Sequence, residues 1–542
     1  MSMHRVLTTL ACTLATLTAV LATVRPALPT PTSTSTSTSA STSASTQRTD
    51  RATPAVGTTV RTHDGVLRGT AHDGYDTFEG IPYAAPPVGR LRWAPPRPAR
   101  PWAGTRDATR PASACPQPAA EVPGGSTDED CLYLNVTTPV GTTPQRPRPV
   151  IVWLHGGGFT TGAGSSYDAH RMATRGDVVV VTVNYRLGAL GFLAQAGLPG
   201  SGTFGLADQQ AALRWVRDGI GAFGGDPHHV TLAGESAGGY SVCAQLASPA
   251  AAGLFERAII QSGPCTGRPD RPFAPFAAAL PAARETGARF AAEVGCSSAR
   301  GTLACLREVK VSRLLAAQEP DQQPAYATPL LPRDPAAALA AGRVHHVPVL
   351  IGSNHDEGNG WAAGIIQAGH PVTAETWPDV VAAFFPDPAR ARAIVREYPV
   401  TGDDGGPVFG AVIGDADFAC PTLRTGDLLS TRVPVWRYEF ADEHAPPLTP
   451  GTPPFPLGAP HAAELPYLYD LGGRSRTMTP AQRRLAATMI DYWTRFARTG
   501  APDTPSAPPW QRRSVQSLAP DHTGPTRTTA TRHHCAFWNA LP

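Results

Sequence analysis

The sequence predicts an α/β fold, with a large, mostly parallel and twisted central sheet that helices cover on both faces. Uninterrupted apolar runs at 149–154 and 178–183 are typical of strands that are buried on both sides. A stretch of helical periodicity follows at 207–223, and strands that alternate with helices favour a parallel sheet. Hydrophobic residues make up 42% of the 542 residues, which is enough for a large core.

The first 56 residues differ in composition from the rest of the chain. Residues 1–28 combine a short, weakly basic start with an uncharged run rich in Ala, Leu and Thr, the pattern of a removable secretory signal peptide. Residues 29–56 are rich in Ser and Thr and hold too little apolar surface to fold, so we expect a disordered tether. No linker interrupts residues 57–542, which we interpret as one domain of a secreted protein without a membrane span in its mature form.

Further elements are expected along this domain. Short apolar runs predict strands at 230–233, 258–260 and 347–351. The stretch 480–498 predicts an amphipathic helix whose apolar side packs in the core. The segments 268–345 and 358–430 are helical and rich in Pro and Ala, and we expect them to leave the sheet and build the walls of an active-site gorge. Ligands of such sheets bind beyond the carboxyl ends of the strands.

Charge and motifs limit the partners. The formal net charge is +3, from 46 basic and 43 acidic residues, and this balance gives no reason to expect nucleic acid as a partner. The chain contains neither an H-E-x-x-H zinc motif nor a phosphate-binding P-loop, so we expect no metal and no cofactor. The sequence gives no indication of the oligomeric state.

The most specific motif is Gly234–Gly238, which reads G-x-S-x-G. It lies directly after the predicted strand 230–233 and before a helical stretch at 239–246, the context in which such a serine is a nucleophile. The turn is so sharp that the serine occupies a strained conformation, and side chains on the flanking glycines would collide. Ser236 is therefore the candidate nucleophile.

A second motif, His155–Phe159, carries three consecutive glycines at the end of another predicted strand. A glycine run lets successive backbone N–H groups point toward one place. Together with the N–H of Ala237, these groups can hold the negative oxygen of a tetrahedral intermediate, and one such donor typically stabilises the transition state by about 3–4 kcal/mol. We interpret this loop as an oxyanion hole.

A serine nucleophile needs a base, and the base needs an orienting carboxylate. In this architecture the expected chain order is serine, acid, histidine. Six histidines follow residue 356, namely His370, His444, His461, His522, His533 and His534. His461 is the preferred candidate because it follows a Gly/Pro loop and precedes an apolar stretch. Asp356 and Glu357 both follow the strand at 347–351, and the residues alone neither choose between them nor exclude a structural His461.

Many ordered motifs from Gly57 to Pro542 resemble the type-B carboxylesterase family of α/β-hydrolases, which includes cholinesterases, carboxylesterases and some fungal lipases. The similar segments are Gly80–Ala84, Pro86–Arg90, Glu129–Val136, Asn184–Arg186, Phe223–Pro227 and Gln261–Gly263. The resemblance implies Ser236 as nucleophile, Glu357 as acid and His461 as base. It also implies that the N–H groups of Gly157, Gly158 and Ala237 form the oxyanion hole, and it puts a family glutamate at Glu235, next to the nucleophile.

The resemblance also sorts the eight cysteines that remain once Cys12 leaves with the signal, since spacing alone does not assign partners. It implies the disulfides Cys115–Cys131, Cys296–Cys305 and Cys420–Cys535. Cys243 and Cys265 are left over, and we expect Cys243 to be a buried thiol on the helix after the nucleophile. The resemblance further implies two ion pairs that hold the fold, Arg92–Glu129 and Arg186–Asp208.

The expected activity is hydrolysis of small-molecule carboxylic esters through an acyl-enzyme. The loop between Cys115 and Cys131 contains no tryptophan, which argues against choline esters because cholinesterases bind the cation on an aromatic residue there. The same loop offers little apolar surface for a lid, which disfavours the first alternative, a triacylglycerol lipase. The second alternative is a catalytically inactive, neuroligin-like binding module, and the retained nucleophile position argues against it.

Overall fold

The structure is a computed structural model. It describes residues 57–143, 145–267, 277–297, 301–318, 323–505 and 507–541. The predicted signal peptide at 1–28 and the tether at 29–56 lie outside these ranges, so neither prediction is tested. No helix in the described part of the chain is long and apolar enough to cross a membrane.

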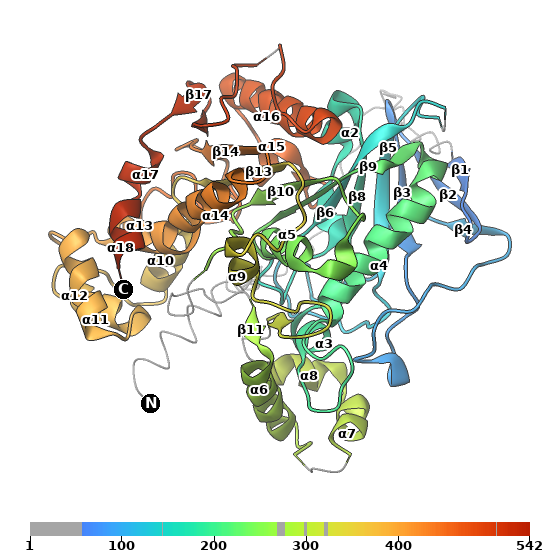
Figure 1. The fold of residues 1–542 in the computed structure, drawn as a ribbon, viewed down its shortest axis with the longest axis horizontal. Helices are drawn as coiled ribbons and strands as arrows, with labels where there is room; N and C mark the ends of the chain where they lie inside the picture. Colours follow the sequence, from blue (N-terminus) through green and yellow to red (C-terminus); the bar gives the residue numbers. More distant parts are fainter. Residues whose placement is uncertain are drawn as a thin grey trace, which may run out of the picture.

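One large mixed sheet organises the described residues, and its central part is parallel (Figure 1). Its strands, in spatial order, are β1 (Gly57–Arg61), β2 (Val66–Ala71), β3 (Tyr75–Pro82), β5 (Tyr133–Pro139), β8 (Val179–Val183), β6 (Arg148–Leu154), β9 (Gly225–Glu235), β10 (Arg257–Gln261), β13 (Val349–Asn354), β14 (Val435–Phe440), β16 (Val515–Leu518) and β17 (Thr523–Thr526), with β4 (Thr105–Asp107) beside β2. Neighbours from β8 to β16 pair in parallel, whereas β1, β2, β3 and β5 pair antiparallel, as does β17 with β16. The predicted fold class is confirmed, and the antiparallel edges are an addition to it.

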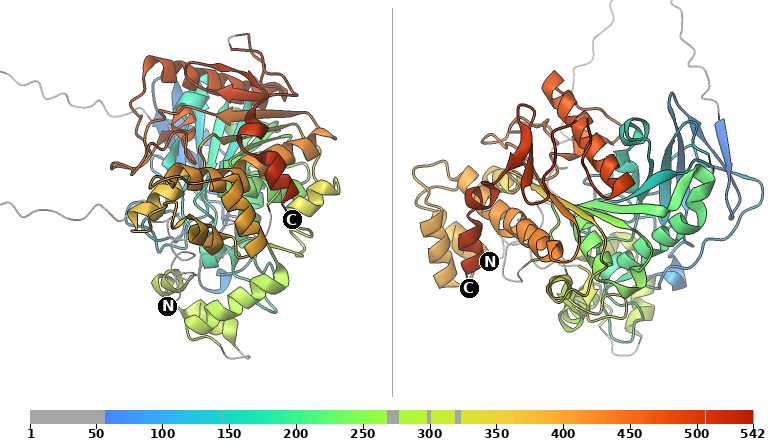
Figure 2. Two further views of the ribbon diagram at one scale, coloured as in Figure 1. Left: turned by 90° about the vertical axis from the view of Figure 1, so that its left-hand side faces the viewer. Right: turned by 45° about the horizontal axis from the view of Figure 1, so that its top comes forward.

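Helices cover both faces of this sheet (Figures 1 and 2). They include α2 (His170–Gly176), α3 (Gly188–Phe192), α4 (Phe204–Gly219), α5 (Ala237–Ala247) and α16 (Pro480–Thr499). Alternate residues of β6 enter two separate cores: Val150 and Val152 pack in the core of α4 and α5, while Ile151 and Trp153 pack in the core of α2 and α16. Burial on both faces explains why these strands are uninterrupted apolar runs.

The predicted excursions form two helical groups, one at the bottom and one toward the left of Figure 1, and the end of the second packs back against β13 and β14. The first group contains α6 (Leu280–Glu293), α7 (Thr302–Glu308) and α8 (Val311–Ala317); α9 (Pro335–Ala340) packs near α5. The second contains α10 (Asn359–Gln367), α11 (Trp377–Phe384), α12 (Pro388–Glu397), α13 (Gly406–Gly414), a π-helical turn (Asp415–Ala419) and α14 (Cys420–Ser430). The short helices α15 (Leu465–Leu468), α17 (Thr529–Arg532) and α18 (Cys535–Ala540) follow later in the chain, and the short strands β7 (Tyr167–Asp168), β15 (Asp470–Leu471), β11 (Ala278–Ala279) and β12 (Ala325–Tyr326) pair in twos.

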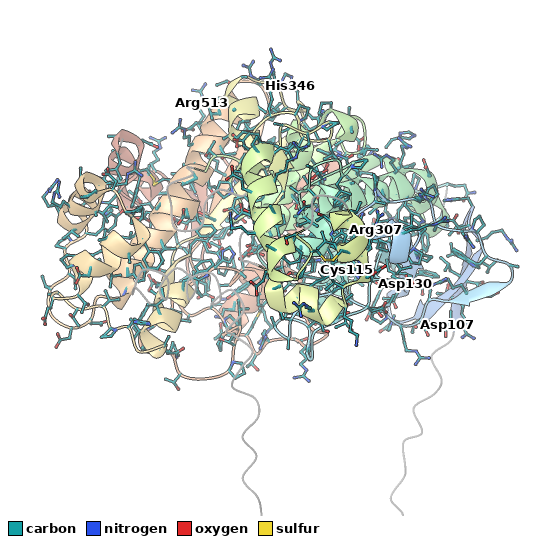
Figure 3. The ribbon with its side chains drawn as sticks, turned by 90° about the horizontal axis from the view of Figure 1, so that it is seen from below. Asp107, Cys115, Asp130, Arg307, His346 and Arg513 are labelled. Atoms are coloured by element: carbon teal, nitrogen blue, oxygen red, sulfur yellow. A yellow bond between two sulfur atoms is a disulfide. The ribbon has the colours of Figure 1, made fainter. Side chains whose placement is uncertain are left out.

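The two implied ion pairs are present. Arg186 binds Asp208 at 2.7 Å, and both side chains are buried. The guanidinium of Arg92 binds Glu129 and also donates to the backbone carbonyl of Arg307, so it joins the loop of the first disulfide to the segment of α7. Figure 3 labels Arg307 together with Cys115, which begins that loop. These ion pairs hold segments of the fold together.

The cysteine pairing corrects one expectation. The described residues form four disulfides: Cys115–Cys131, Cys296–Cys305, Cys420–Cys535 and Cys243–Cys265. Cys243 is buried as expected, but the prediction of a free thiol is wrong. The physical reason is the crossing of α5 over β10: the segment that leaves β10 passes the helix, and the Cα atoms of Cys243 and Cys265 come within 5.2 Å, a normal disulfide distance.

Candidate active site

Ser236 occupies a sharp turn between β9 and α5. Its backbone has φ 53° and ψ −122°, a region that non-glycine residues rarely adopt. The turn requires glycine on both sides: a Cβ at Gly234 would collide with the backbone of Gly238, and a Cβ at Gly238 would collide with the carbonyl of Leu154 on β6. In this conformation Ser236 lies between the end of β9 at Glu235 and the start of α5 at Ala237.

The glycine loop after β6 lies beside this turn. Gly157 and Gly158 have φ values of 98° and 60°, which only glycine adopts readily, and both are at least partly exposed. A Cβ built on Gly156 would lie 3.1 Å from the Cβ of Ser236, so the loop and the turn touch. Within the described ranges, no acceptor is paired with the N–H groups of Gly157, Gly158 or Ala237. These three amides are available to a ligand.

His461 and Glu357 are joined by a hydrogen bond. Nδ1 of His461 lies 2.6 Å from Oε2 of Glu357, and the backbone N–H of His461 donates to the Glu357 carbonyl at 3.2 Å. The carboxylate is fully buried, and its Oε1 accepts a bond from the backbone N–H of Asn354 at 2.8 Å. With the carboxylate fixed in this way, Nδ1 of His461 faces Glu357, and Nε2 is the ring nitrogen that remains for other partners.

The neighbouring carboxylate, Asp356, points elsewhere. Its Oδ2 accepts a bond from the backbone N–H of Ala459 at 2.9 Å, and its Oδ1 lies 3.0 Å from Nδ1 of His355. The two adjacent acids therefore serve two different histidines, and Glu357 is the one that meets His461.

Glu235 is the partner of the other nitrogen of His461. Its Oε1 lies 3.2 Å from Nε2 of His461, and Glu235 is the residue just before Ser236. In the part of the chain that the structure describes, no hydrogen bond joins Nε2 to the hydroxyl of Ser236. His461 therefore lies close to the turn that carries Ser236, because it contacts the residue that precedes the serine.

Carboxylates dominate the electrostatics around His461. Burial by itself lowers the pKa of His461, but the charges of Glu235 and Glu357 outweigh it and raise the pKa to about 9. Burial raises the pKa of Glu235 well above its ordinary value; nearby Glu464 and Glu357 add to this, and His461 opposes it. The carboxyl groups of Glu235, Glu357 and Glu464 therefore all interact with the imidazole of His461, and their protonation is coupled to its own.

A buried polar network supports the acid, and sequence reasoning did not assign it a role. Glu464, fully buried, accepts bonds from Gln261 at 2.9 Å and from the side chain of Asn354 at 2.8 Å, and Trp493 donates to Gln261 at 2.8 Å. Gln261 and Asn354 are the last residues of the adjacent parallel strands β10 and β13. Gln261 and Asn354 are polar residues at the ends of apolar strands, and this sequence pattern could have identified both of them as candidates for the site.

Two aromatic side chains from the second excursion pack against the imidazole of His461. The ring centres of Trp361 and Phe418 lie 4.8 Å and 4.9 Å from that of His461, and the two rings stack on each other at 5.5 Å. Both residues belong to the segment 358–430, so this excursion reaches the imidazole of His461 with two aromatic rings.

The parallel sheet, the strained serine turn and the unpaired amides define an α/β-hydrolase, a class of enzyme that transfers acyl groups. The profile described as "Carboxylesterase family" matches residues 56–538, and the chain belongs to this family. It is 37% identical to a para-nitrobenzyl esterase of Bacillus subtilis (strain 168), over 82% of this chain and 90% of the relative. It is 33% identical to a cocaine esterase of Homo sapiens, over 89% and 91%, and 35% identical to the pyrethroid hydrolase Ces2e of Rattus norvegicus, over 83% of each. The protein is a carboxylesterase, a serine hydrolase of esters.

Proposed function

We propose that Ser236, His461 and Glu357 are the catalytic triad of this esterase. In the first step, Nε2 of His461 takes the proton of the Ser236 hydroxyl as its oxygen attacks the ester carbonyl. His461 returns that proton to the departing alcohol, which leaves an acyl-enzyme. Water, deprotonated by the same nitrogen, attacks the acyl carbon, releases the acid and restores the serine.

One observation carries this proposal: the 2.6 Å bond between His461 Nδ1 and the buried carboxylate of Glu357, beside the strained turn of Ser236. A buried carboxylate in this position fixes the tautomer and stabilises the imidazolium that forms. Catalytic hydrogen bonds to a serine are often long in a free enzyme and shorten once substrate binds, so the contact of His461 with Glu235 is compatible with the mechanism.

The N–H groups of Gly157, Gly158 and Ala237 are proposed as the oxyanion hole. They are backbone donors without an acceptor in the described residues; Gly156, which precedes the two glycines, lies against Ser236, and Ala237 directly follows it. Negative charge that develops on the carbonyl oxygen during the attack is stabilised most by donors that are already oriented.

We further propose that the substrates are small-molecule carboxylic esters with short or medium acyl groups. The relatives' names refer to para-nitrobenzyl, cocaine and pyrethroid compounds, and Trp361 and Phe418 give this chain an apolar wall that suits such groups. A series of nitrophenyl esters with acyl chains of two to sixteen carbons tests this. We expect kcat/KM to be highest for the shorter chains; a maximum at long chains with activation at a lipid interface would identify a lipase instead.

Secretion is also a proposal. Four disulfides are typical of proteins that fold in an oxidising compartment, and the N-terminal composition is that of a signal peptide. Expression of the full chain in a secreting host, followed by N-terminal sequencing of the protein in the medium, tests it. We expect removal of roughly the first 28 residues; an intact N-terminus retained inside the cell would contradict it.

A further inference from the structure

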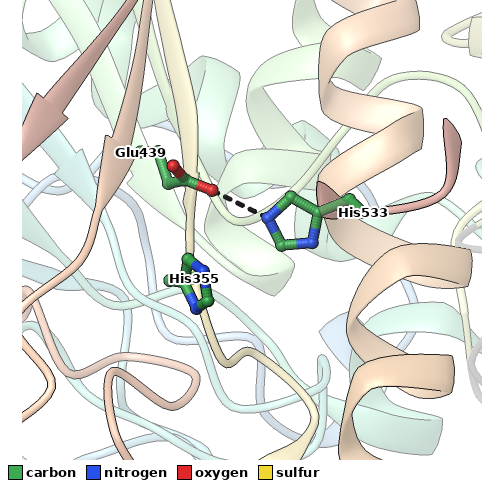
Figure 4. Close-up of side chains that lie close together, drawn as sticks. All are labelled: His355, Glu439 and His533. Carbon is green, nitrogen blue, oxygen red and sulfur yellow. Dashed lines mark hydrogen bonds and ion pairs between the residues drawn. The ribbon is translucent and has the colours of Figure 1, made fainter. Parts of the chain in front are cut away.

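A second group of histidines and carboxylates begins two residues before the proposed catalytic acid, at His355. His355 follows β13 directly, Glu439 belongs to β14, and His533 follows α17 near the C-terminus (Figure 4). One donor atom from each of these three residues lies within 4.8 Å of the other two. We propose that His355, Glu439 and His533 bind a divalent metal ion, with Zn²⁺ as the best match.

The donor set fits zinc. Two imidazole nitrogens and one carboxylate oxygen are a known protein ligand set for Zn²⁺, with a water molecule as the fourth ligand. His533 Nε2 already lies 2.7 Å from Oε1 of Glu439, and the ring centres of His355 and His533 are 5.4 Å apart. A tetrahedral zinc ion with bonds of about 2.0–2.1 Å holds its ligand atoms roughly 3.3 Å apart, so these side chains rotate when the ion binds.

The groups around the donors support the assignment. A metal-binding histidine usually donates its second ring N–H to a carboxylate, which fixes the ring and raises its basicity. Both histidines have that partner: His355 Nδ1 lies 3.0 Å from Asp356, and His533 Nδ1 lies 2.5 Å from Asp415. In each ring this leaves Nε2 for the metal.

The third ligand is oriented in the same manner. Oε2 of Glu439 is held by an ion pair with Arg532 and by a hydrogen bond from Thr529 at 3.3 Å. Oε1 therefore remains as the single oxygen that faces the two histidines. When both imidazoles are neutral, as metal ligands are, Arg532 is the one cation that the described residues place against Asp356, Asp415 and Glu439, so the surroundings favour a bound divalent ion.

The position gives the ion a route and a role. The His355 side chain is 30% exposed, whereas that of His533 is only 5% exposed, so the ion enters from the His355 side. When it binds, it displaces the proton between His533 Nε2 and Glu439, because a zinc ligand must be deprotonated. The ion joins the C-terminal segment to two strands of the sheet, two residues from Glu357.

Zinc binding by the full chain tests the proposal. The chelator-treated protein is titrated with ZnCl₂ by calorimetry, and bound metal is counted by elemental analysis. We expect one zinc ion per chain, and a higher Tm in the presence of zinc because the ion binds only the folded state. His355→Gln and His533→Gln are each expected to weaken binding at least ~100-fold, and Asp415→Asn about 10- to 100-fold, since partners of ligands contribute that much.

His346→Gln is the matched control, because His346 is exposed and lies outside the group (labelled in Figure 3). It is expected to bind zinc as the unaltered protein does. Circular dichroism shows whether each variant is folded, and Asp415→Asn, which leaves all three ligands in place, covers the case in which a histidine variant fails to fold. No zinc binding by the unaltered chain, or equal binding by the folded His355→Gln and His346→Gln variants, would overturn the proposal.

Discussion

Two histidines of this protein, the half-buried His461 and the buried His533, lie in similar charge environments but have different surroundings. His461 lies between Glu235 and Glu357, and His533 lies between Asp415 and Glu439. Beside His461 the chain presents a serine on a strained turn and three unpaired amides, and the imidazole is 16% exposed.

His533, in contrast, is 5% exposed, and its acid neighbour Glu439 is further held by Arg532. No strained serine turn accompanies it in the described residues. Two flanking carboxylates do not distinguish the two histidines, and our assignment of catalysis to His461 therefore rests on the neighbouring turn of Ser236.

The largest expected effect comes from removing the nucleophile. Ser236→Ala should fold, since Ala fits the turn as well as Ser does, and should lose kcat/KM by about 10⁴-fold or more. Steady-state hydrolysis of a nitrophenyl ester measures this. Full activity in the variant would mean that another residue is the nucleophile.

The second effect separates the two histidine groups directly. Glu357→Gln keeps the shape of a fully buried side chain but removes the charge that orients His461, so we expect kcat/KM to fall about 10³- to 10⁴-fold. Asp415→Asn makes the equivalent change beside His533 and should alter kcat/KM only slightly. Equal losses in the two variants would show that the distinction between the groups is wrong.

The third effect compares the disulfides beside the two groups. Cys243–Cys265 closes 22 residues of chain at the nucleophile helix, whereas Cys420–Cys535 closes 115 residues next to His533. Replacing both cysteines by alanine should lower the free energy of unfolding by about 3 kcal/mol for the first pair and about 5 kcal/mol for the second, because longer loops gain more entropy. Denaturant unfolding measures both values. An unchanged free energy of unfolding in the variant without Cys243–Cys265 would contradict a stabilising role of this disulfide.

The smallest effect is a shift in the pH profile. His461 must be neutral to accept a proton, so activity is present above its pKa and is lost below it; burial lowers that pKa, but Glu235 and Glu357 raise it to about 9. Glu235→Gln removes one of these charges, and the acidic limb of kcat/KM should move to lower pH, by about one unit. Glu443→Gln, an exposed glutamate elsewhere, is the control and should leave the limb in place. An upward shift would contradict the charge argument.

Local patterns predict much of this fold and site. The apolar strands and the Gly234–Gly238 turn depend on neighbours in the sequence, and both are found where they are expected. The choice of Glu357 over Asp356 is different, because two adjacent carboxylates differ only in the direction in which each side chain points. Only the family resemblance favoured Glu357, and the structure puts that residue next to His461.

Long-range proximity is the part that local patterns do not contain. Cys243 was expected to be free, because its partner is brought near only by the crossing of α5 over β10. Glu439 and His533 are 94 residues apart in the sequence, so no short spacing motif predicts the group that we propose to bind zinc. The antiparallel strands before β6 were missed as well, since their side chains are only partly buried and lack the long apolar runs of the centre.

Covalent labelling is the most direct test of the central claim that Ser236 is the nucleophile activated by His461 and Glu357. The full chain is treated with a fluorophosphonate, digested and analysed by mass spectrometry. The account predicts one phosphonyl group per chain on Ser236, loss of esterase activity in step with labelling, and no labelling of Ser236→Ala. Labelling of a different serine would contradict it, and so would labelling of the Glu357→Gln variant at the same rate as the unaltered protein.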